Sequence, residues 1–210
     1  MKQDVRDALR YFSVHDHPDS FEFLPGCGSV LFSAPHAVLQ TRNGVIKQAE
    51  RYTGMLCRLL NQRYGLPCIY KSRHMKDDAN HDAQSPYRDA ISQIIKDHGI
   101  RCVLDLHQLA PTRPMALCIG TGHGKHTAGM PDAPDMIKNA FLAHSLLPVT
   151  LDDPFSASAP HTVSASAAAC GIAALQLEIN TSLLMENTQT ERFETVLAAL
   201  AEAAQELQRK

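Results

Sequence analysis

Three short apolar segments of this 210-residue chain carry an ionisable side chain at or near their carboxyl end. They cover residues 29–36, 101–107 and 173–180, and their aliphatic runs predict β-strands. In an open α/β sheet, ligands bind in the crevice beyond the carboxyl ends of the strands, because several loops converge there. We therefore expect the ionisable residues of these segments to meet at one site. They are His36, His107 and Glu178.

Segments with a helical spacing of apolar residues alternate with the predicted strands. The spacing predicts helices over residues 44–64 and 86–98 and at the C-terminal end of the chain. Alternating strands and helices indicate a sheet that helices cover on both faces. We therefore predict one α/β domain over residues 1–210, with three α/β/α layers and a mostly parallel, partly mixed central sheet.

The sheet is predicted to begin with an edge hairpin. Two predicted strands, residues 21–24 and 29–34, flank a turn whose two glycines, Gly26 and Gly28, permit a tight reversal.

Charge and composition favour a small-molecule partner. The net charge of -2 comes from 20 basic and 22 acidic residues mixed along the chain, which provides no field for nucleic acid or an anionic membrane. Six scattered cysteines without a CxxC pair suit a reducing cytoplasm. The charged N-terminus does not resemble a signal peptide, and no apolar run approaches the ~18 residues of a membrane helix. We expect a cytoplasmic protein that acts on a small molecule, and the sequence predicts no oligomeric state.

Two histidines and a carboxylate at strand ends are suitable ligands for zinc, which binds neutral imidazole nitrogens and anionic oxygens. Glu50 lies on the apolar stripe of the predicted helix 44–64, where burying its charge is costly unless a cation lies beside it. Asp105 lies two residues before His107 and so on the same side of the strand, where it can orient the imidazole. Glu178, between Leu177 and Ile179, is the candidate base.

Each of these residues also has a structural interpretation. A single histidine at a strand end is more often hydrogen-bonded than metal-bound. Glu50 can be an ordinary surface glutamate, Glu178 can form a core salt bridge, and Asp105 can cap a helix or join a buried salt bridge. The combination of residue types, rather than any one of them, favours the metal site.

The order of these motifs resembles the N-formylglutamate amidohydrolase family. The similarity extends from Ser33 to Asn180 and is carried by Pro35-His36, a helix carboxylate, Asp78-x-Asn80, Asp105-Leu-His107 and Leu177-Glu-Ile-Asn180. The resemblance implies a phosphorylase/hydrolase-like fold related to the zinc carboxypeptidases. It also implies one zinc ion per chain, held by His36, Glu50 and His107, with Glu178 as the general base.

The chain departs from the family pattern at two positions near these motifs. His81 stands where members usually have an arginine, and Gln108 stands where they tend to have a serine. These departures leave open which residue binds the carboxylate of the substrate. The candidates are Arg73, Asn80, Arg88 and His161. The arginines are chosen because a guanidinium donates two parallel hydrogen bonds to a carboxylate.

The function expected is zinc-dependent hydrolysis of an amide in a small N-acyl amino acid or related carboxylate compound. Zinc lowers the pKa of bound water toward ~7, and Glu178 takes the proton and returns it to the leaving amine. The alternative is a metal-binding or ligand-sensing protein that has the same fold but no turnover. A serine or cysteine hydrolase is not favoured, because the chain has no Gly-x-Ser-x-Gly motif and Cys102 begins a buried strand.

Overall fold

The computed structural model describes residues 2–14, 17–185 and 190–210. These residues form a seven-stranded sheet with the order β1-β5-β2-β6-β9-β7-β8. The strands are β1 (Phe21–Leu24), β2 (Val30–Ala34), β5 (Cys68–Lys71), β6 (Cys102–Leu109), β7 (Leu117–Gly120), β8 (Val149–Leu151) and β9 (Ala173–Asn180). The central strands β5, β2, β6 and β9 are parallel, whereas β1 and β7 run antiparallel to their neighbours β5 and β9. This confirms the predicted mixed sheet.

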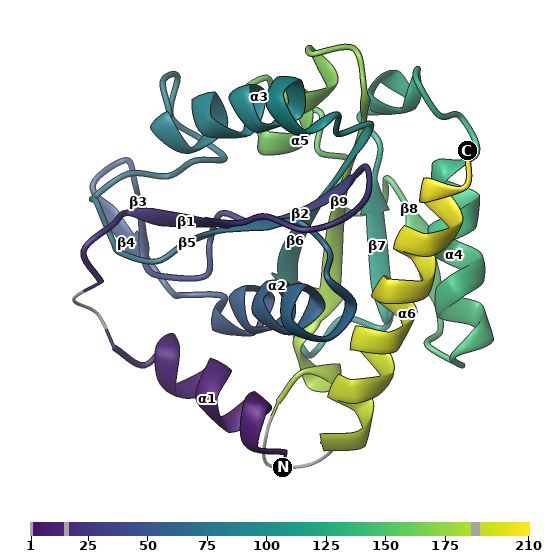
Figure 1. The fold of residues 1–210 in the computed structure, drawn as a ribbon, viewed down its shortest axis with the longest axis horizontal. Coiled ribbons are helices and arrows are strands. Elements are labelled where there is room, and N and C mark those ends of the chain that lie inside the picture. The colour runs from purple at the N-terminus through teal and green to yellow at the C-terminus, as the bar shows by residue number, and fades with distance from the viewer. Residues whose placement is uncertain (1, 15–16, 186–189) are drawn as a thin grey trace.

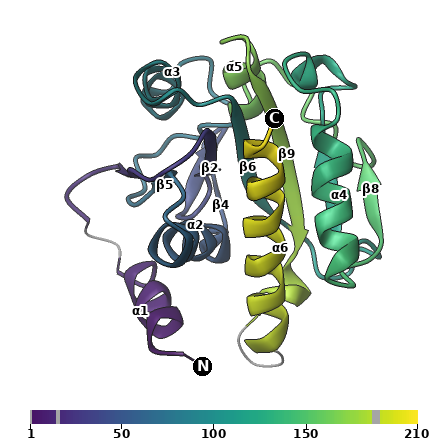
Figure 2. The ribbon, with the colours of Figure 1, turned by 45° about the vertical axis from the view of Figure 1, so that its right-hand side comes forward.

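Helices cover both faces of the sheet (Figure 1). One face carries α3 (Pro86–His98) and the short α5 (Val163–Ala168), and the other carries α1 (Gln3–Tyr11), α2 (Arg51–Tyr64), α4 (Ala133–Ala143) and α6 (Thr190–Gln208). Figure 2 shows α6 standing between α2 and α4 on that second face. Two 3-10 turns, η1 (Lys125–Thr127) and η2 (Thr181–Leu183), complete the helical elements of the described chain. The three-layer architecture is therefore confirmed.

The predicted edge hairpin is wrong. Strand β1 pairs antiparallel with β5, which lies between β1 and β2 in the sheet. The connection crosses the N-terminal end of β5, where the Cys27 amide donates to the Gly65 carbonyl oxygen at 2.6 Å. A Cβ on Gly26 would lie 2.3 Å from that same oxygen, so the close approach requires glycine.

The predicted helix over residues 44–64 begins later than expected. A two-stranded sheet of β3 (Gln40–Arg42) and β4 (Val45–Lys47) comes first, and α2 begins at Arg51. Asn43 and Gly44, at the turn of this hairpin, have φ angles of 52° and 77°. Two successive positive φ angles are typical of the tight Asn-Gly hairpin turn, which ends the helical pattern. Ile46, counted in the helix stripe, is 62% exposed in β4.

Side-chain alternation along β6 decides which residues face which layer. Leu104 and Leu106 pack in the core cluster that contains α2 and α6, whereas Val103 packs in the cluster that contains α3 and α5. Because alternate residues of a strand share a face, Asp105 and His107 lie on the side of α3 and α5. Helix α5 has only six residues, so this face carries less helix than the other.

No helix in the described part of the chain is long and apolar enough to cross a membrane.

The hydroxyl of Tyr87 fastens α3 to the carboxyl end of β2. It accepts a hydrogen bond from the Ala34 amide (3.1 Å), donates to the Ile69 carbonyl oxygen (3.0 Å) and lies 3.0 Å from the Ser33 hydroxyl. Tyr87→Phe leaves the buried Ala34 amide without its acceptor. We expect this substitution to lower the free energy of unfolding by about 1–3 kcal/mol in urea titrations followed by circular dichroism.

Tyr64→Phe, at an exposed position on α2, is the matched control and should change that free energy by less than about 0.5 kcal/mol. Equal stability of Tyr87→Phe and Tyr64→Phe would contradict the role given to the Tyr87 hydroxyl.

Candidate metal centre

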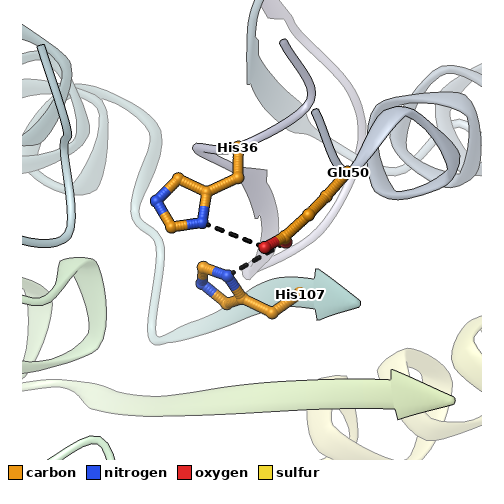
Figure 3. Close-up of side chains that lie close together, drawn as sticks. All are labelled: His36, Glu50 and His107. Atoms are coloured by element: carbon orange, nitrogen blue, oxygen red, sulfur yellow. Dashed lines mark hydrogen bonds and ion pairs between the residues drawn. The ribbon is translucent and has the colours of Figure 1, made fainter. Parts of the chain in front are cut away.

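His36, Glu50 and His107 bring their ligand atoms within 4.8 Å of one another. Figure 3 shows the Glu50 carboxylate between the two imidazole rings, with the Nδ1 atom of each ring directed at it. The distances are 3.3 Å from His36 Nδ1 to Glu50 Oε1 and 3.2 Å from His107 Nδ1 to Glu50 Oε2. Three ligand atoms of the types that zinc prefers therefore converge on one point.

Backbone structure at the sheet edge places the three side chains. His36 lies two residues beyond β2, and His107 lies within β6, the next strand of the sheet. Glu50 is the N-cap residue of α2, and its backbone amide donates to the His36 carbonyl oxygen at 2.7 Å. The Gln108 amide donates to Glu50 Oε2 at 3.0 Å, and the positive end of the helix dipole also favours the carboxylate.

Gln108 connects this carboxylate to the first turn of α2. Its side-chain oxygen accepts the Tyr52 amide at 3.0 Å, while its side-chain nitrogen donates to the Thr181 hydroxyl at 3.3 Å. Glu50 does not cap α2 with its own side chain. The glutamine thus satisfies a helix amide and leaves the Glu50 carboxylate to face the histidines.

Buried carboxylates hold the outer nitrogens of both imidazoles. His36 Nε2 lies 2.9 Å from Asp78 Oδ1, and His107 Nε2 lies 3.0 Å from Asp105 Oδ2. Both aspartates are fully buried, and Asp105 also accepts a hydrogen bond from the Ser33 hydroxyl at 2.8 Å. An imidazole that donates its Nε2–H to a carboxylate presents the lone pair of Nδ1 to the inside of the site, as metal-bound histidines do.

The buried carboxylates around His36 and His107 favour positive charge at the centre of the cluster. Burial opposes the imidazolium form of His36, but the charge of Glu50 and the hydrogen bond to Asp78 outweigh it and raise the pKa. Burial likewise opposes the imidazolium of His107, but the charges of Asp105 and Glu50 raise its pKa well above the usual value. Burial also opposes the charged form of Glu50, yet the two imidazoles lower its pKa to about 2. A divalent cation supplies the charge that protons otherwise provide, so the donor set fits zinc.

Glu178 lies beside the cluster, on the neighbouring strand. Its register partner across the β6 and β9 pair is His107, and it is 9% exposed. The Gln176 side chain donates to Glu178 Oε1 at 2.9 Å. Burial raises the pKa of Glu178, which makes its carboxylate a better proton acceptor than an exposed one.

A cavity of about 510 Å³ opens over the cluster and Glu178. Its far wall comes from residues 154–159, in the loop between β8 and α5. Besides this loop, three lining residues have no role in the sequence analysis: Arg42, Gln176 and Thr162. The position of Gln176, two residues before Glu178 on a strand, is the signal that could have identified it. The sequence holds no comparable signal for Arg42, which lies just before the segment predicted as a helix.

The predicted substrate-binding residues separate into two groups. Asn80 lines the cavity, where its amide oxygen accepts the Val163 amide at 2.7 Å and its amide nitrogen donates to Asp105 Oδ2 at 3.3 Å. Arg73 is not among the lining residues. The Asn80 amide thus supports Asp105, which in turn holds the His107 ring.

Arg88 and His161 lie outside the cavity and together line a separate hollow between α3 and α5. The Arg88 guanidinium donates to four backbone carbonyl oxygens, those of Ala79, Asp82, Ala83 and His161. His161 is exposed. The buried Arg88 guanidinium therefore connects the loop of residues 79–83 to that of His161. Neither Arg88 nor His161 lines the cavity.

Comparisons with known proteins place this arrangement in context. The model of the N-formylglutamate amidohydrolase family matches residues 81–185, which is half of the chain. No curated protein matches the sequence. A solved gene product of Agrobacterium tumefaciens is 16% identical, with 90% of this chain and 93% of that chain covered and a TM-score of 0.64.

Two further similar structures are of proteins named for an activity. N-formylglutamate amidohydrolase from Ralstonia eutropha JMP134 is 15% identical, covers 90% of this chain and 97% of its own, and has a TM-score of 0.63. A metallo-carboxypeptidase from Burkholderia cenocepacia is 14% identical, covers 87% of this chain and 59% of its own, and has a TM-score of 0.50. These similarities confirm the predicted relation to the carboxypeptidase-like fold.

The cluster geometry predicts which substitutions remove a bound metal. His36→Ala and His107→Ala each delete one of three ligands, so we expect each protein to lose the zinc that the wild type retains after purification without chelators. Elemental analysis measures the content. His81→Ala is the matched control, since its partly exposed ring lies beside Asn80 and pairs with Asp82 instead of facing the cluster. Metal retained in both His36→Ala and His107→Ala would contradict the site.

The raised imidazole pKa values predict a pH dependence of zinc affinity. Below these pKa values the metal must displace protons from His36 and His107, so affinity rises with pH and falls as the rings protonate. We expect an increase of up to about tenfold per pH unit for each displaced proton between about pH 6 and 8. Calorimetric titrations in buffers of different ionisation enthalpy measure both affinity and proton release. An affinity that does not change with pH would contradict the protonated state of the metal-free cluster.

Proposed function

Because the chain belongs to the N-formylglutamate amidohydrolase family, we propose that it is a zinc-dependent hydrolase that cleaves the amide bond of a small N-acyl amino acid or related carboxylate compound. One observation carries the proposal. Two imidazoles whose outer nitrogens are held by buried aspartates direct Nδ1 at a shared glutamate, and a second, protonatable glutamate lies in register on the next strand.

His36, Glu50 and His107 are the residues that would hold the zinc ion. When bound, zinc polarises a carbonyl oxygen and lowers the pKa of water toward ~7. Asp78 and Asp105 would keep the two imidazoles in the tautomer that ligation requires.

Glu178 is the proposed general base and acid. Its Oε1 accepts the hydrogen bond from Gln176, which leaves Oε2 to take a proton from the attacking water. The same carboxyl group then returns the proton to the nitrogen of the leaving amine, so that the amide C–N bond breaks with a neutral amine departing. The raised pKa of Glu178 supports both transfers, because a carboxylate with a low pKa is a poor base.

The size of the cavity supports a small substrate. A volume of about 510 Å³ lies within the range of pockets that enclose small molecules. The net charge of -2 also gives no support to a nucleic-acid or membrane partner. The name of the family and that of the Ralstonia eutropha structure both denote an amide of an amino acid. We propose a cytoplasmic location on the cysteine usage alone.

The second candidate is a metal-binding or ligand-sensing protein without turnover. This candidate follows from His81 and Gln108, the two positions at which the chain differs from the family pattern. Gln108 has a specific task in the structure, since it caps α2 and supports Glu50. That task supports an intact ligand set and is compatible with either candidate, so turnover itself must be measured.

Glu178→Gln separates the two candidates. It preserves the shape of the side chain and removes its ability to take a proton, so we expect kcat on N-formyl-L-glutamate to fall by about 10²–10⁴-fold. Zinc content, measured by elemental analysis, should stay near that of the wild type because Glu178 is not one of the clustered ligands.

Glu191→Gln, at an exposed carboxylate on α6, is the matched control and should retain full activity. A wild type that binds zinc but hydrolyses no N-acyl amino acid, and that behaves like Glu178→Gln, would favour the ligand-sensing protein.

A further inference from the structure

Arg42 is a cavity residue that neither the metal cluster nor the proposed base accounts for. Among the described residues that line the cavity, it is the only arginine and no lysine is present. Its side chain is 39% exposed, so it lies at the rim and not in the core. It belongs to β3, in the segment between His36 and Glu50.

The position of the guanidinium is defined by one ion pair. Arg42 Nε donates to Asp78 Oδ2 at 2.8 Å, and the other oxygen of Asp78 accepts from His36. Only one carboxylate and one imidazole ring separate the guanidinium from Glu50. No hydrogen bond within the described residues uses the Nη1 or Nη2 atoms of Arg42, so those donors remain for a ligand.

The hairpin that carries Arg42 is fastened to the body of the protein. The Thr41 amide donates to the Asp77 carbonyl oxygen at 3.0 Å, and the Thr41 hydroxyl lies 2.8 Å from His74 Nε2. A guanidinium held by its Nε atom on an anchored strand is already oriented, so little side-chain entropy is lost when a ligand binds.

The other basic residues that could bind an anionic substrate group do not line the cavity. Arg88 is committed to backbone carbonyls, and Arg73 does not line the cavity. His81, at the position where the family usually has arginine, pairs with Asp82 and does not line the cavity either. An anionic substrate group in a cavity that contains Glu50 and Glu178 needs a cation, and a planar guanidinium suits a carboxylate.

We propose that Arg42 binds the free carboxylate of the substrate and thereby sets a preference for N-acyl amino acids over their neutral amides. This inference rests on the proposed function, because it assigns a substrate group to the same cavity. Arg42 is also placed to steady Asp78 and through it His36. A role limited to that support would affect charged and neutral substrates alike, and this difference makes the inference testable.

The test compares Arg42→Gln with the wild type on three compounds. N-formyl-L-glutamate has two carboxylates, whereas N-formyl-L-glutamine and N-formyl-L-isoglutamine each have one replaced by a carboxamide. We expect Arg42→Gln to lower kcat/KM on N-formyl-L-glutamate by about 10- to 100-fold. For the amide that has lost the carboxylate bound by Arg42, we expect a loss of less than about threefold. Arg73→Gln is the matched control and should preserve the order of preference.

A second measurement is independent of turnover. Calorimetry follows the binding of N-formyl-L-glutamate to zinc-loaded Glu178→Gln protein, with and without Arg42→Gln, after zinc binding by each protein has been measured. We expect the double variant to bind zinc and to bind the ligand about 10- to 100-fold more weakly.

The outcomes separate this inference from the proposed function. Equal losses on all three compounds, or unchanged ligand affinity in the double variant, overturn the role of Arg42 while leaving the hydrolase in place. Ligand binding that depends on Arg42, in a protein whose wild type hydrolyses none of the three compounds, overturns the hydrolase and supports Arg42. No ligand binding to the zinc-loaded Glu178→Gln protein overturns the inference directly.

Discussion

The pairing of each imidazole with a buried aspartate is the interaction on which the rest of the site depends. A fully buried carboxylate needs a hydrogen-bond donor or a cation, and a buried imidazole needs its two nitrogens in defined roles. Asp78 and Asp105 meet both needs at once, because each accepts from the outer nitrogen of one histidine. The inner nitrogens are then left facing the Glu50 carboxylate. The fold supplies the buried aspartates, and these decide which atoms the cavity presents.

The sheet brings the two halves of the site together through register. In the β6 and β9 pair, Asp105 is opposite Gln176, and His107 is opposite Glu178. Because the strands are parallel, the supporting residue lies two residues before the functional residue on each strand. Asp105 supports His107, and Gln176 supports Glu178, in two matching steps along the same face. A shift of one residue in either strand would turn its two polar side chains into the opposite apolar layer.

Much of this arrangement could be predicted from the sequence, and the exceptions have physical causes. His36, His107 and Glu178 were accessible because apolar strands that end in ionisable residues are a local pattern. The start of α2 was missed because the spacing of Ile46 and Ala49 continues the helical period, although Asn43 and Gly44 carry a stronger hairpin signal. The pairing of β1 with β5 was not accessible, since it depends on which strand docks beside β2 and not on the turn between them.

Glu50 illustrates a prediction reached through an incorrect intermediate. The helical spacing over residues 44–64 predicts it inside a helix, on the apolar stripe, where burial of its charge requires a cation. The structure places it at the N-cap, where the requirement for a partner is the same but the side chain points along the sheet edge instead of into a helix interface. The need for a cation or hydrogen-bond donors is the same in both positions, because it depends on burial of the charge, and the Glu50 side chain is only 19% exposed at the N-cap.

The hydrogen bond from the Glu50 amide to the His36 carbonyl oxygen closes the intervening segment into a ring at its base. The two metal-ligand candidates are therefore joined directly, whatever the length of chain between them. Because the closure entropy of a loop grows only slowly with its length, residues can be added to or removed from the β3 and β4 hairpin without changing the spacing of the ligands in space. The hairpin can thus differ in length and sequence, and with it the rim of the cavity, while His36 and Glu50 keep their spacing.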